Sequence, residues 1–233
     1  MKFSENIQEY IRNHYWMVII ILFVLIIISL FSPSPYYNKE YYNPAKRILL
    51  ISNNIEELTY ERDIEQYLIS KEDIKYIYYD YDESSGYLDL LNKIQELLDK
   101  HPLEYDSVGI MFHTETPNTL KLFKRDKNVI ETTSNDKTAR DQYDTFTLFA
   151  RSVKEMVGIQ KTITDIDLIS CQLLPLSGKT MFKYISQKAG VNVNASTDAS
   201  GDGADWYLEE GNRNLVGIYF NTAIYNSGIK LIA

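Results

Sequence analysis

Residues 165–182, DIDLISCQLLPLSGKTMF, join a short apolar run to a helix-like stretch and carry the only cysteine of the chain, Cys171. The run at 165–171 is typical of a buried strand, and residues 176–190 favour a helix that Gly190 closes. This stretch therefore predicts a strand-to-helix unit with a thiol at the carboxyl end of the strand.

The same alternation of strand and helix extends along the rest of the chain. Continuously apolar strands are typical of a sheet that is covered on both faces, and alternation with helices predicts parallel pairing. We therefore expect an α/β sandwich of three layers, with helices flanking a mostly parallel sheet. The expected strands are 46–52, 74–82, 106–113, 165–171 and 191–196, the expected helices are 54–70, 86–100, 141–158 and 176–190, and a β-hairpin or arm is expected at 119–133.

Composition limits the classes of function. The chain has 233 residues, enough for one domain and a small appendage. The net charge of −8 and the absence of a basic stripe argue against a nucleic-acid partner. A single cysteine excludes an internal disulfide. We expect neither a cofactor nor a bound metal.

Residues 15–31, YWMVIIILFVLIIISLF, contain no charge and predict a transmembrane anchor in contact with membrane lipid. A helix of this length just spans a hydrocarbon core of roughly 30 Å. A cleaved signal peptide and a buried core helix are the alternatives. Residues 1–14 are then an N-terminal tail, residues 32–44 a proline-containing linker, and residues 45–233 the α/β domain. Basic residues lie on both sides of the span, so the expected single-pass protein has no predicted orientation.

His113 and Cys171 stand out because each ends a predicted strand. Ligands and chemistry collect at the carboxyl ends of the strands in an open parallel sheet. If the two strands are neighbours, an imidazole lies within reach of a thiol, which is the arrangement of a Cys–His dyad. The alternatives are a small buried hydrophobic cysteine and a histidine that satisfies a loop carbonyl.

Three segments together resemble a known family. VGIMFH (108–113), DIDLISCQLLPLSG (165–178) and VNVNASTDASGDGADWYLE (191–209) are similar to the caspase-like domain of unknown function 4347, found in large bacterial surface proteins. The resemblance implies a sandwich of the caspase and gingipain type with a His113/Cys171 dyad. The family has glycine at the positions of Thr114 and Ser170, and it implies that the Thr114 N–H forms part of an oxyanion hole.

The acidic stretch around Asp198, Asp202 and Asp205 has three interpretations. It is the wall of a substrate pocket for a basic side chain, a Ca²⁺ site, or a turn whose aspartates bond locally. Trp206, next to it, is expected in the core. The leading hypothesis for the whole chain is a membrane-anchored cysteine peptidase that acts on a peptide or protein. The alternative is a catalytically inactive binding or docking module on the same fold.

Overall fold

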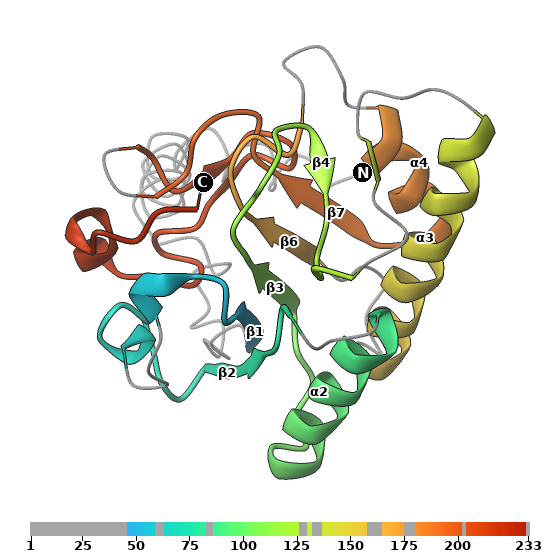
Figure 1. The fold of residues 1–233 in the computed structure, drawn as a ribbon. Helices are drawn as coiled ribbons and strands as arrows, with labels where there is room; N and C mark the ends of the chain where they lie inside the picture. The colour runs from blue at the N-terminus through green and yellow to red at the C-terminus, as the bar shows by residue number, and fades with distance from the viewer. Residues whose placement is uncertain are drawn as a thin grey trace, which may run out of the picture. The chain divides into compact units, whose positions relative to one another are not determined.

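Five parallel strands form the centre of the protein (Figure 1). The computed structural model describes residues 46–58, 63–82, 86–125, 130–131, 137–157, 165–174, 180–201 and 204–231. The chain divides into two units, Met1–Pro44 and Ala45–Ala233, and all described residues belong to the second.

The strand order of the central sheet is β2-β1-β3-β6-β7, and every pairing in it is parallel. The expected α/β class and the mostly parallel sheet are therefore confirmed. The strands of this sheet are β1 (Arg47–Ser52), β2 (Ile74–Tyr79), β3 (Ser107–Met111), β6 (Asp165–Ile169) and β7 (Asn192–Ala195).

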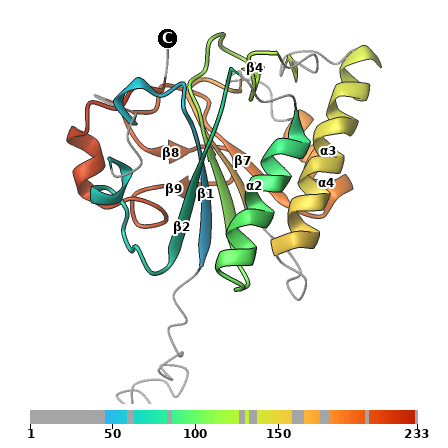
Figure 2. The ribbon, with the colours of Figure 1, turned by 60° about the horizontal axis from the view of Figure 1, so that its bottom comes forward.

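Three α-helices cover one face of the sheet (Figure 2). They are α2 (Tyr87–Lys100), α3 (Lys137–Val157) and α4 (Thr180–Ala189). In α2 the buried residues Leu90, Ile94 and Leu97 recur at intervals of four and three, so one stripe of the helix faces the sheet. Ile48 and Leu50 of β1 belong to the core on this side.

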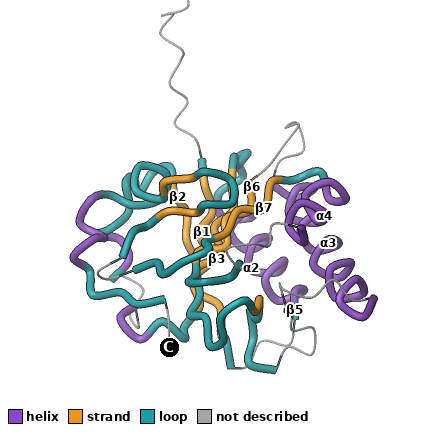
Figure 3. Tube along the Cα trace, turned by 90° about the horizontal axis from the view of Figure 1, so that it is seen from above, coloured by secondary structure: helices purple, strands orange, loops and turns teal. Residues whose placement is uncertain are grey.

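The opposite face is covered by irregular chain rather than by long helices. Leu49 and Ile51 alternate with the residues on the helical side and pack against a second core, which contains the fully buried Trp206. The α-helices lie on one side of the strands, and irregular chain with short helices lies on the other (Figure 3). The elements of this layer are the 3-10 helices η1 (Glu56–Leu58), η2 (Ile64–Gln66) and η3 (Thr222–Asn226), with the hairpin of β8 (Tyr207–Leu208) and β9 (Arg213–Asn214).

The helix predicted over 54–70 is wrong. The described part of this stretch forms the short helices η1 and η2 instead. Ile55 and Ile64 are both fully buried, and nine residues correspond to two and a half helical turns. A continuous helix would place these two side chains on opposite faces, whereas two separate turns place both in the core.

The other elements follow the expectation to within a few residues. In the predicted arm, β4 (Thr119–Leu120) and β5 (Ile130–Glu131) pair antiparallel, which confirms the hairpin. Within the part of the chain that the structure describes, no helix is both long and apolar enough to span a bilayer. The predicted span at 15–31 lies outside the described residues.

Candidate functional site

The carboxyl edge of the sheet is hollowed where the strand order reverses. The chain runs from β1 outward to β2 and then returns to place β3 on the other side of β1. Such a switch point is where open parallel sheets bind ligands. Two hollows of about 320 and 380 Å³ open here and share Asn54, Glu56 and His113 in their walls. The remaining lining residues are Asn53, Glu57, Tyr81, Asp82, Glu115, Lys124 and Lys230.

Asn54 positions His113 by a reciprocal pair of hydrogen bonds. The His113 N–H donates to Asn54 Oδ1 at 3.2 Å, and Asn54 Nδ2 donates to the His113 carbonyl oxygen at 3.3 Å. Asn54 follows β1 and His113 follows β3, so a side chain from one strand end fixes the backbone of the next. The backbone of His113 is thereby fixed at the wall of both hollows.

His113 and Cys171 follow neighbouring strands. β3 pairs with β6, with Met111 opposite Ile169, and each of the two residues lies two positions beyond that opposed pair. The expectation that the two strands are neighbours is therefore confirmed. Among the hydrogen bonds of the described residues, none joins the His113 ring to the thiol.

The Cys171 thiol is fully buried and bonded to the backbone of Ser200. Sγ donates to the Ser200 carbonyl oxygen at 2.9 Å and accepts from the Ser200 N–H at 3.0 Å. Burial raises the pKa of Cys171 from 9.0 to about 11, although the N–H groups of Ser200 and Leu231 act in the opposite direction. In this conformation the thiol is protonated at neutral pH.

Thr114 uses both of its hydrogen-bonding groups within the protein. Its N–H donates to the Leu231 carbonyl oxygen at 3.1 Å, and its hydroxyl is hydrogen-bonded to the hydroxyl of Ser170. Both residues are buried. The N–H that the family resemblance assigns to an oxyanion hole is thus occupied by the segment around Leu231.

The structure brings Asp198 and Asp205 together with Glu209. Their carboxylate oxygens lie within 4.8 Å of one another, and both aspartates are exposed. Burial, and then the charges of Asp198 and Glu209, raise the pKa of Asp205. Neither aspartate lines the two hollows beside His113. Asp202 lies outside the described residues.

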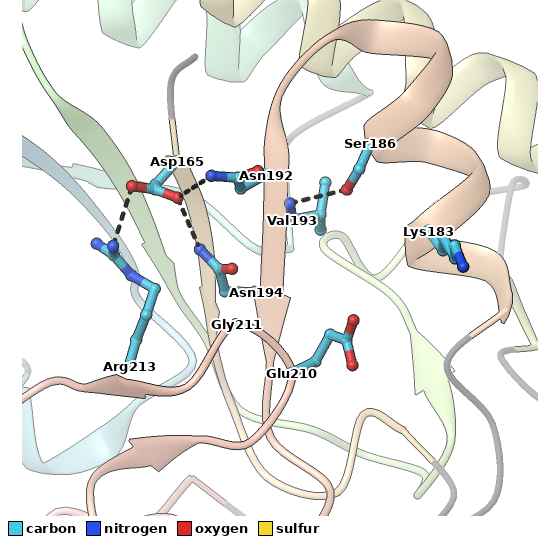
Figure 4. A pocket seen from close by; sticks show the side chains of 9 residues that line it. All are labelled: Asp165, Lys183, Ser186, Asn192, Val193, Asn194, Glu210, Gly211 and Arg213. Atoms are coloured by element: carbon cyan, nitrogen blue, oxygen red, sulfur yellow. Dashed lines mark hydrogen bonds and ion pairs between the residues drawn. The ribbon is translucent and has the colours of Figure 1, made fainter.

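A further hollow, of about 470 Å³, lies at the amino ends of β6 and β7 (Figure 4). Arg213 Nη1 and Asn192 Nδ2 contact opposite oxygens of Asp165, each at 2.9 Å. Arg213 also contacts both carboxylate oxygens of the fully buried Asp167, at 2.7 and 2.9 Å. Burial alone would lower the pKa of Arg213, but the charges of Asp167 and Asp165 raise it. These bonds fasten β9 to the sheet, which is a structural role.

Sequence reasoning missed the residues that surround the predicted dyad. Asn54 contacts His113, Ser200 contacts Cys171, and Leu231 contacts Thr114. The two residues of each pair lie far apart in the chain. The pair of asparagines after the apolar run 46–52 was a usable signal, because a polar residue at a strand end is placed at the same edge as His113. No local sequence pattern indicates that Ser200 or Leu231 lies beside Cys171 or Thr114.

No protein-family model matches the chain, and no curated protein matches it either.

Proposed function

We propose that the domain is a caspase-like cysteine peptidase in a latent conformation, with Cys171 as the nucleophile and His113 as the base. The observation that carries this proposal is the placement of both residues beyond the same opposed pair of β3 and β6, with His113 in the wall of the hollows. The imidazole would take the thiol proton, and the thiolate would attack the carbonyl carbon of a peptide bond. The amine would leave with that proton, and water would then release the acyl group from sulfur.

The latency follows from the state of the thiol. A nucleophilic cysteine requires a depressed pKa and access to solvent, whereas the pKa of Cys171 is raised and its side chain is buried. The Thr114 N–H is also engaged by Leu231. Catalysis therefore requires a rearrangement that uncovers Cys171 and frees this N–H.

A binding or docking module without activity is the second candidate. The paired bonds between Cys171 and Ser200 favour it, because they satisfy the thiol as a buried structural group. In that case the hollows beside His113 hold a ligand that is not cleaved.

Two finer parts of the proposal concern specificity and location. Asp198 and Asp205 would accept an arginine or lysine side chain through charge-assisted contacts, because their carboxylates cluster with Glu209. Residues 15–31 would anchor the domain to a membrane, because they form an uncharged apolar run. Extraction of the full chain from membranes by detergent, but not by alkaline carbonate, would support the anchor, and release by carbonate would contradict it.

The peptidase proposal is tested with fluorogenic peptides on the full chain in mild detergent. Because the described conformation is latent, we expect slow turnover in the wild type and faster turnover in the loosened variant described below. This turnover should disappear when Cys171→Ala is added, fall strongly with His113→Ala, and be greater for peptides with Arg or Lys before the scissile bond. Equal turnover in the wild type and Cys171→Ala would contradict the proposal that Cys171 is a peptidase nucleophile. A complete lack of turnover, even in the loosened variant described below, would favour the inactive binding module.

A further inference from the structure

The segment Ile229–Leu231 lies across the predicted catalytic residues. The Leu231 carbonyl oxygen accepts from Thr114 N–H, and the Leu231 backbone N–H faces the Cys171 sulfur. Lys230 forms an antiparallel bridge with Gly201, the residue after Ser200. One extended segment therefore contacts the backbone after β3, the thiol after β6 and the loop that bonds the thiol.

The side chains of this segment alternate between core and solvent. Ile229 and Leu231 are buried, whereas Lys230 is exposed and lines the hollow that also contains His113. The segment is thus in contact with both the thiol and the histidine hollow. An extended peptide that is read by its backbone makes contacts of this kind, with alternate side chains entering pockets.

The loop under the segment is shaped for close backbone approach. Gly201 has a φ of +118°, which side chains rarely permit. A Cβ atom at this position would lie 2.6 Å from the Ile229 carbonyl oxygen and 3.3 Å from the Leu231 nitrogen. The backbone of Ile229–Leu231 can approach residue 201 this closely only because that residue is glycine.

We propose that Ile229–Leu231 is an autoinhibitory strap, which occupies the place of an extended peptide substrate and covers Cys171 until it lifts. This inference rests on the proposed function for the identity of the peptide site. Whether the segment covers the thiol does not depend on that function, and it is measured by a separate experiment. Lifting the strap frees the Thr114 N–H and opens Cys171 towards the hollow of His113. The peptide that replaces it would carry apolar side chains at alternate positions, as Ile229 and Leu231 do.

The strap is tested by the rate at which iodoacetamide alkylates Cys171, the only thiol, in the folded full chain at pH 8. Gly201→Ala should loosen the strap, and Gly217→Ala is the matched control. Gly217 also has a positive φ, of +97°, but a Cβ there meets no atom within 4 Å. Because the two substitutions share the backbone strain and differ in the clash, we expect alkylation roughly tenfold faster in Gly201→Ala than in the control. Equal rates would overturn the strap.

Urea dependence provides a second measurement in the wild type, which applies even if Gly201→Ala does not fold. Lifting a short segment exposes little surface, so alkylation should depend on urea less steeply than global unfolding does. If the two dependences are equally steep, the segment opens only when the whole domain unfolds, and the strap proposal fails.

Labelling and turnover separate this inference from the proposed function. Faster alkylation of Gly201→Ala with peptide turnover supports both. Faster alkylation without turnover supports the strap and contradicts the peptidase. Unchanged alkylation contradicts the strap, whatever the turnover is.

Discussion

The hydroxyl of Thr114, after β3, is hydrogen-bonded to the hydroxyl of Ser170, after β6. Both residues are buried. The two hydroxyls thus satisfy one another. A hydroxyl at either position alone would be buried without this partner, which costs free energy.

This pairing predicts non-additive losses of stability. Thr114→Val and Ser170→Ala should each lower the free energy of unfolding by about 1–3 kcal/mol, because each leaves the other hydroxyl without its partner. The double variant should lose clearly less than the sum of the two. Urea denaturation of the wild type, both single variants and the double variant provides the measurement. Simple additivity would show that the bond contributes nothing.

The raised pKa of Cys171 predicts a loss of stability at high pH. The folded thiol keeps its proton up to a pKa of about 11, whereas the unfolded thiol loses it near 9.0. Between these values the folded state binds more protons than the unfolded state, so stability falls as the pH rises. The slope from this group is about 1.4 kcal/mol per pH unit. Below pH 9.0 the contribution is constant and fully present.

Cys171→Ala provides the reference for this effect, since lysines and tyrosines also titrate in the same range. The difference in unfolding free energy between the wild type and Cys171→Ala should be flat from pH 6 to 8 and should shrink above pH 9.0. A difference that stays constant up to pH 11 would mean that the thiol is not held in a buried, protonated state.

The contact of Arg213 with Asp167 predicts a large effect of removing the arginine. Arg213→Met should lower the free energy of unfolding by about 3–5 kcal/mol, because it leaves the buried Asp167 carboxylate without its cation. Arg151→Met is the control, since Arg151 is exposed and donates to the Lys188 carbonyl oxygen from the surface of α3. Thermal and urea unfolding measure both. Similar small losses in the two variants would contradict the structural role of the Arg213 network.

Asn54 is predicted to matter for the position of His113. Asn54→Ala removes two hydrogen bonds to the His113 backbone and should cost about 1–2 kcal/mol of stability. The His113 amide should then exchange its hydrogen faster, while amides in the centre of β3 should change only by the global loss. Asn226→Ala, at an exposed asparagine in η3, serves as the control. Unchanged exchange at His113 would rule out the positioning role.

The strands and α-helices were predictable because local periodicity determines them. β1 was expected at 46–52 and forms at Arg47–Ser52, and α2 was expected at 86–100 and forms at Tyr87–Lys100. The helix prediction for 54–70 failed because the apolar residues of this stretch belong to two short helical turns, and the two turns face the core at different helical phases. His113 and Cys171 were expected at one sheet edge on the condition that their strands are neighbours, and β3 does pair with β6.

The environment of the site was not predictable, because it depends on contacts between distant residues. Cys171 belongs to the same buried cluster as Leu231, which lies sixty positions later in the chain. The contact of Arg213 with the buried Asp167 was not predicted either, because nothing in the sequence singled out these two residues for each other.

The two faces of the sheet differ in how far apart their contacts lie along the chain. On the irregular face, Asn221 Nδ2 donates to the Gln66 carbonyl oxygen across 155 residues, and the Tyr219 hydroxyl donates to Ser107 across 112. Closing loops of this length costs conformational entropy before any contact offsets it, so such contacts form late in folding. We therefore expect the irregular layer to assemble after the helical one, and the residues around Cys171 to be among the last to reach their native positions during synthesis of the chain.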